Sequence, residues 1–112
     1  MKGGAPEQEV STGNVFADLG LPASGELLVK AELARRIADV AAQRRLTQAE
    51  AARILGTTQP KVSELVAGKL AGFSVERLIR FLNAFGQDVE IRVSPKPRSH
   101  ESATVRVLAH GR

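Results

Sequence analysis

The chain has 112 residues and a mass of 12.0 kDa, enough for one small domain with tails and too little for two separate cores. Apolar residues make up 43% of it and charged residues 25%, a globular composition. The absence of cysteine excludes disulfides, thiolate zinc sites and cysteine nucleophiles. There is no apolar run of transmembrane length and no signal-peptide stretch at the N-terminus, so we expect a cytoplasmic protein.

The charge balance favours a polyanionic partner. Sixteen Lys and Arg residues against twelve Asp and Glu give a net charge of +4, with the excess in residues 24–94 and 95–112. Both histidines, His100 and His110, fall in the C-terminal tail without a second ligand at zinc-site spacing. The sequence also lacks a nucleophile–base pair and a phosphate-binding glycine loop. It therefore predicts no enzyme, no metal and no cofactor.

The chain is expected to divide into three parts. Residues 1–13 have no hydrophobic periodicity and should form a flexible arm, residues 14–94 a folded domain, and residues 95–112 a basic tail. The domain opens with the apolar run Asn14–Pro22, which is predicted to add one helical turn to the core. A long helix is predicted over Gly25–Arg44, where apolar residues repeat at intervals of three and four.

Capping signals place the starts of the helices. Ser24 can cap the long helix. Thr47 and Glu50 have the spacing of a capping box, which predicts a second helix over Gln48–Leu55. Gly56 is expected to end that helix, because the residue after a helix often has a left-handed backbone.

Two further helices follow the same logic. Thr58 can cap a helix over Gln59–Ala67, with Gly68 after it. Ser74 can cap a last helix that runs to Gly86. The predicted fold is therefore mostly α, a compact bundle of four to five helices.

The period of the pattern changes to two over Asp88–Ser94, which predicts a short C-terminal β-strand. Its apolar face carries Val89, Ile91 and Val93. A lone strand needs a partner, and the simplest is the same strand of a second copy, where Glu90 would face Arg92 of the other chain. The alternative is a hairpin within the chain, made with a weak second strand at Thr104–Leu108.

The two short helices on either side of Gly56 have the pattern of a helix-turn-helix. Ala52 is small at the point where these helices would cross, and Gly56 makes the turn. Val62 and Leu65 lie three residues apart and would face the first of the two helices. In a basic protein this combination predicts binding to double-stranded DNA.

Thr47–Leu65, with the sequence TQAEAARILGTTQPKVSEL, resembles the helix-turn-helix of lambdoid phage repressors and Cro, the XRE family. Four segments resemble the HigA-type antitoxins of type II toxin–antitoxin operons: NVFADLGL at 14–21, TQPKVSEL at 58–65, AGKLAGFSVERL at 67–78 and FGQDVEIRV at 85–93. The resemblance covers roughly Asn14–Val93. It implies a lambda-repressor-like helix-turn-helix within the helical bundle.

The resemblance also implies a function. A HigA-type antitoxin would be a homodimer that represses its own operon and neutralises a RelE/HigB-like toxin. The apolar segment Val15–Leu21 and the first helix are then the predicted toxin-facing surfaces. Two alternatives stay open: a stand-alone XRE-family repressor without a toxin, and a protein-binding adaptor whose helix-turn-helix no longer contacts DNA.

The resemblance implies that Gln59–Ala67 enters the major groove and that Gln48–Leu55 crosses the DNA backbone. The predicted base-reading residues are Gln59, Lys61, Ser63 and Glu64. The predicted phosphate-binding residues are Gln48, Thr58 and Lys69, with Arg44 as a further candidate. Gln59 is the first choice for base reading, because a glutamine amide can bond to both N6 and N7 of adenine. Glu64 can accept from cytosine N4 or form a salt bridge instead.

Two positions depart from the phage pattern. Pro60 stands where phage repressors often present a polar base-reading side chain. Either fewer bases are read there, or Pro60 reads a thymine methyl group by apolar contact. Ala67 stands where an asparagine often precedes Gly-Lys, which removes one expected phosphate contact. The target sequence of a phage repressor therefore does not carry over to this chain.

Overall fold

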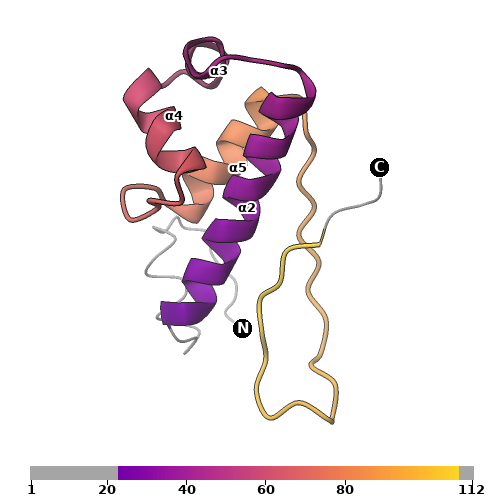
Figure 1. The fold of residues 1–112 in the computed structure, drawn as a ribbon. Coiled ribbons are helices and arrows are strands. Elements are labelled where there is room, and N and C mark those ends of the chain that lie inside the picture. Colours follow the sequence, from indigo (N-terminus) through magenta and orange to yellow (C-terminus); the bar gives the residue numbers. More distant parts are fainter. Residues whose placement is uncertain (1–22, 109–112) are drawn as a thin grey trace.

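The computed structural model describes residues 23–108, which form four helices and no β-strand (Figure 1). The helices are α2 (Ala23–Gln43), α3 (Gln48–Leu55), α4 (Gln59–Val66) and α5 (Val75–Ala84). The long helix α2 packs against α5 and α4, and α3 packs against α4 and α5. The predicted helical bundle is confirmed. The predicted arm, the helical turn at Asn14–Pro22 and His110 lie outside the described residues.

Three of the four predicted helix starts are confirmed. Thr47 and Glu50 form the capping box: the Glu50 N–H donates to Thr47 Oγ1 at 3.0 Å, and the Thr47 N–H donates to Glu50 Oε1 at 2.8 Å. Thr58 and Ser74 accept from backbone N–H groups three residues on, at 3.3 Å and 3.0 Å. The predicted cap at Ser24 is wrong, because α2 already begins at Ala23 and Ser24 lies within the helix.

Each helix is followed, within one or two residues, by a residue with a left-handed backbone. Gly56 has φ +73°, and the next N–H, of Thr57, donates back to the carbonyl of Ala52 at 2.9 Å. The end of α2 has the same bond pattern with Arg45 at φ 56° in place of a glycine. The predicted ends of α2 and α4 were each one residue too late, and α5 ends at Ala84, before the predicted end at Gly86.

One apolar core joins the helices. Its most deeply buried side chains are Phe73, Phe85, Ile37 and Leu78. Helices α3 and α4 contribute smaller apolar side chains to the same cluster: Ala51, Ala52, Leu55, Val62 and Leu65. Because these two helices are only 8 residues each, their stability depends on this burial rather than on their own length.

The strand predicted over Asp88–Ser94 is not formed, and neither is the weak strand at Thr104–Leu108. A strand requires a ladder of hydrogen bonds to a neighbouring backbone, and the described part of this single chain offers none. Val89 and Val107 pack against the core, whereas Ile91 and Val93 are 79% and 90% exposed.

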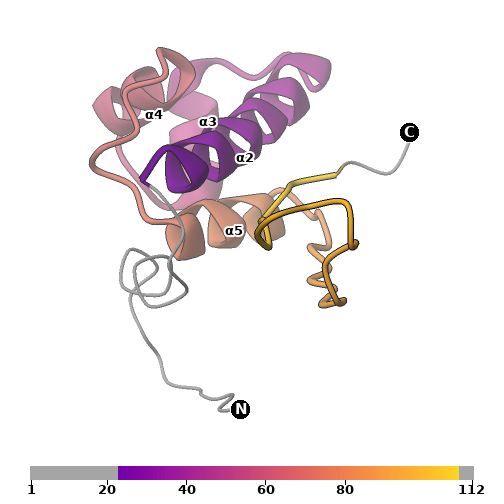
Figure 2. The ribbon, with the colours of Figure 1, turned by 90° about the horizontal axis from the view of Figure 1, so that it is seen from below.

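After α5 the chain forms a long extended loop with a turn at the end farthest from the helices. In that turn the His100 N–H donates to the Pro97 carbonyl at 3.1 Å, and Lys96 Nζ donates to the His100 carbonyl at 3.0 Å. Figures 1 and 2 show that residues 86–108 leave the bundle on the side away from α4. The C-terminal segment therefore leaves the outer face of α4 uncovered.

Candidate nucleic-acid interface

The helix-turn-helix is built from α3, the turn at Gly56 and α4. Ala52, Val62 and Leu65 are all buried, at 5%, 5% and 3% exposure, so a small side chain and two larger ones form the contact between the two helices. A Cβ added at Gly56 would meet nothing within 4 Å, so glycine is required there for its left-handed backbone and not for space. The buried face of α4 leaves its polar face to solvent.

The structure joins the first residues of the two helices through their side chains. Gln59 Nε2 donates to Gln48 Oε1 at 2.8 Å, and this bond is exposed. A glutamine amide has two N–H donors and one carbonyl acceptor. Gln59 therefore keeps one N–H and its carbonyl oxygen free, and Gln48 keeps both of its N–H donors free.

The neighbouring polar groups also retain free donors. Thr58 Oγ1 accepts from the Lys61 N–H, which leaves the hydroxyl proton of this exposed residue available. Lys69 is exposed just beyond α4, and its N–H closes the helix by donating to the Glu64 carbonyl at 2.9 Å. Gln48, Gln59, Thr58 and Lys69 thus have side-chain donors available to a ligand, and Gln59 also has its carbonyl oxygen available.

Lys61 has contacts within the chain. Its ammonium is 3.5 Å from Glu64 Oε1 and 5.2 Å from the centre of the Phe73 ring, so the side chain folds back toward the α4–α5 loop. Ser63 is half-buried, while Glu64 remains exposed. Among the four predicted base readers, Gln59 and Glu64 are therefore the two exposed ones.

Arg44 contacts Phe85 at the end of α5, away from the helix-turn-helix. Its Nη2 donates to the Phe85 carbonyl at 2.6 Å, and its guanidinium lies 5.4 Å from the centre of the Phe85 ring. A cation at the carbonyl end of α5 is favourable, because the unpaired carbonyls there carry partial negative charge. This contact ties the end of α2 to the end of α5 and does not bring Arg44 to the other predicted phosphate ligands.

Sequence reasoning missed Arg77. Its guanidinium lies 5.3 Å from the Phe73 ring centre and 5.4 Å from that of Phe81, and its Nη2 donates to Thr57 Oγ1 at 3.2 Å. Arg77 thereby connects α5 to the turn of the helix-turn-helix. Arg77 stands four residues from each phenylalanine, and this spacing was the available signal.

Glu50 is the one described residue with a resolved shift of its ionisation. The Thr47 N–H and then the Thr47 hydroxyl group lower the pKa of the Glu50 carboxyl below its ordinary value, and Arg53 adds to this effect. The charged carboxylate is therefore the form that the first turn of α3 favours.

Residues 23–108 lack two further kinds of feature. No helix in this range is long and apolar enough to cross a membrane. The same range contains no group of three or more His, Asp and Glu residues that could hold a metal ion.

Comparison with known proteins identifies the family. A family model described as a helix-turn-helix domain matches residues 15–94. A solved structure named as an XRE family transcriptional regulator is 49% identical, with a TM-score of 0.76, and the match covers 80% of this chain and 100% of that one. The chain belongs to the XRE-like helix-turn-helix family of DNA-binding regulators. No curated protein matches it.

All four described helices lie within the range that matches the XRE-like family. The turn at Gly56 and the pair α3 and α4 lie inside the matched range, and so does the segment that follows α5 as far as residue 94. The match also includes residues 15–22, which precede α2. The unit that the family shares is therefore larger than the four described helices.

Proposed function

We propose that this XRE-like protein regulates transcription by sequence-specific binding to double-stranded DNA, with α4 in the major groove and Gln59 as the principal base reader. The observation that carries the proposal is the hydrogen bond from Gln59 Nε2 to Gln48 Oε1. It holds the Gln59 amide at the exposed start of α4 and limits the directions in which its remaining groups can point.

The free groups of Gln59 match one base in particular. Adenine presents N7 as an acceptor and N6–H as a donor in the major groove. The free Nε2–H of Gln59 can donate to N7, and Oε1 can accept from N6–H. Because Gln48 already accepts the other Nε2–H, this bond would favour the amide orientation that suits adenine before DNA is bound.

The other polar groups support this placement. Gln48 and Lys69, together with the Thr58 hydroxyl, have free donors for phosphate oxygens, and such contacts fix register without reading sequence. Ser63 and Glu64 are secondary base readers in the proposal. Lys61 can join them only by leaving Glu64 and the Phe73 ring.

We also propose that the protein is a homodimer joined through residues 88–94. Ile91 and Val93 are exposed in the single chain, and this segment lies away from α4. Antiparallel pairing with a second copy would cover Ile91 and Val93 and leave both α4 helices free for half-sites about 34 Å apart. Val89, which already packs on the core, would anchor the strand.

The finer proposal is that the protein is the antitoxin of a type II module. This proposal is supported by the sequence resemblance of residues 14–21, 58–65, 67–78 and 85–93 to HigA-type antitoxins. The unit would be residues 14–94, with residues 95–112 as a basic tail. Deletion of residues 1–22 is expected to abolish neutralisation of a RelE/HigB-like toxin and to spare DNA binding, as measured by co-expression growth assays and gel shift.

Titration of labelled DNA tests base reading directly. The wild-type protein and the Gln59→Ala variant are titrated against the duplex upstream of their own gene and against a scrambled duplex, at two salt concentrations. Gln59→Ala is expected to weaken specific binding by about 1–3 kcal/mol and to leave the scrambled duplex unaffected. The salt dependence of both proteins should be the same, because Gln59 neutralises no phosphate.

Gln43→Ala is the matched control, because Gln43 is an exposed glutamine at the end of α2 and outside the proposed interface. It should bind as the wild type does. Equal weak binding of the wild type to both duplexes would reject sequence-specific reading and would favour a protein partner instead.

A further inference from the structure

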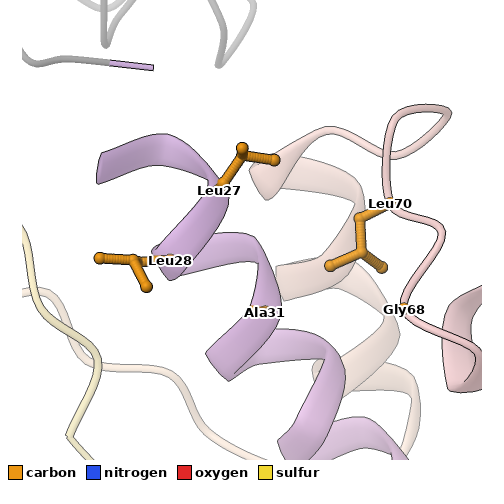
Figure 3. Close-up of a pocket in the computed structure, with 5 residues that line it drawn as sticks. All are labelled: Leu27, Leu28, Ala31, Gly68 and Leu70. Atoms are coloured by element: carbon orange, nitrogen blue, oxygen red, sulfur yellow. The ribbon is translucent and has the colours of Figure 1, made fainter. Parts of the chain in front are cut away.

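An apolar groove lies between the N-terminal half of α2 and the loop that joins α4 to α5 (Figure 3). It is open to solvent, has a volume of about 460 Å³ and is lined by Leu27, Leu28, Ala31, Gly68 and Leu70. Leu27 and Leu28 are 57% and 68% exposed. Figure 3 shows Leu27 projecting from α2 on the side of the loop that carries Leu70.

The chemistry of the lining indicates the kind of occupant. Sites for small molecules combine apolar walls with a few placed polar side chains that orient the ligand. The lining residues of this groove carry no polar side chain. A short apolar peptide segment therefore fits the groove better than a polar small molecule does.

We propose that the occupant is the chain's own apolar segment Val15–Leu21, which precedes α2 and lies outside the described residues. Its apolar side chains are Val15, Phe16, Ala17, Leu19 and Leu21. Val15, Phe16 and Leu19 have the three- and four-residue spacing that places side chains on one face of a helical turn. The proposal does not depend on DNA binding.

The point where the segment joins α2 supports this occupant. α2 begins at Ala23, and Leu27 lies four residues further, about 6 Å along the helix axis. Pro22 separates the segment from α2, and a proline disfavours helical backbone at the residue before it, Leu21. A change of chain direction at this point, as the proposal requires, would bring the segment back to the first turns of α2.

Two further considerations favour this segment over a separate protein. The family match begins at residue 15, the first apolar residue of the segment, so the segment belongs to the same unit as the bundle. A tether of a few residues also gives the segment an effective concentration in the millimolar range at the groove. A separate partner would have to displace it.

A single tryptophan tests the proposal in the full-length chain, which has neither Trp nor Tyr of its own. In the Phe16→Trp variant the emission maximum should lie to the blue of the value measured in denaturant. Adding Leu27→Asp should shift the emission toward the denatured value, because a carboxylate in the groove opposes docking. Adding Leu108→Asp, at another exposed leucine, should leave the emission unchanged.

Each outcome supports or rejects docking of Val15–Leu21 in the groove. Emission of Phe16→Trp that equals the denatured value, or that ignores Leu27→Asp while circular dichroism shows an unchanged fold, overturns the proposal. Because the chain has no cysteine, Phe16→Cys with Leu27→Cys supplies a second test. Oxidation should give a disulfide within one chain at any protein concentration. Disulfides formed only between chains would assign the groove to a second copy and reject the proposal.

Discussion

The pair α3 and α4 and the segment 88–94 have equally regular sequence patterns, yet only the helices form in the single chain. The two helices close their hydrogen bonds within a few residues, and Thr47, Glu50, Thr58 and Gly56 satisfy their ends locally. A strand has no such local solution, because its hydrogen bonds go to another strand. The difference teaches that an alternating pattern does not make a strand unless a neighbouring backbone completes its hydrogen bonds.

Removal of the core contact under α4 should have the largest effect. Leu65 is 3% exposed, and Leu65→Ala is expected to lower the free energy of unfolding by about 2–5 kcal/mol through lost burial and a cavity. Urea unfolding followed by circular dichroism measures it. Val66→Ala is the control, since Val66 is 47% exposed, and it should cost about 0.5 kcal/mol or less. Similar losses for both would mean that α4 does not depend on core burial.

A substitution in segment 88–94 should affect association of the chains and leave the stability of the single chain nearly unchanged. Ile91 is exposed in the single chain, so Ile91→Asp should leave monomer stability nearly unchanged and weaken the proposed dimer more than tenfold, about 1.4 kcal/mol. Sedimentation equilibrium measures the association. Glu101→Gln, at an exposed site in the tail, is the control and should not change it. A monomeric wild type, or a dimer insensitive to Ile91→Asp, would refute pairing through this segment.

The contact between α5 and the turn should have an intermediate effect. Thr57→Val removes the acceptor for Arg77 Nη2, and Arg77→Met removes the donor and the cation over the two rings. Each is expected to lower stability by about 1 kcal/mol. A double-mutant cycle should show coupling of about 0.5–1.5 kcal/mol, because the two residues share one hydrogen bond. Strict additivity would show that Arg77 acts through the phenylalanines alone.

The smallest effect should come from Glu50, and it should depend on pH. The folded state lowers the pKa of this carboxyl, so the contribution is present above the ordinary pKa and is lost as pH falls through the lowered value. Glu50→Gln keeps an acceptor for the Thr47 N–H but cannot ionise. The stability difference between wild type and variant should therefore shrink on acidification from neutral pH, measured by urea unfolding. A difference that is independent of pH would contradict the assignment.

The parts of the site that could be predicted are those set by short spacings. The capping box of Thr47 and Glu50 and the helix starts after Thr58 and Ser74 were all visible in the sequence, because each involves groups three residues apart. The bond between Gln48 and Gln59 was not predicted, although both residues were singled out. Its two partners are eleven residues apart and meet only when α3 and α4 cross.

The sequence by itself determined the four described helices, apart from the start of α2 and the ends of α2, α4 and α5, because helical hydrogen bonds, caps and apolar periodicity are local properties. Only the tertiary structure decided what the cations do: Arg44 holds the end of α5, Arg77 holds the turn, and Lys61 folds onto Phe73. It also decided that Ile91 and Val93 find no partner within the described chain. The reason is physical, because long flexible side chains and strand edges choose among partners that are distant in sequence, and packing alone brings those partners within reach.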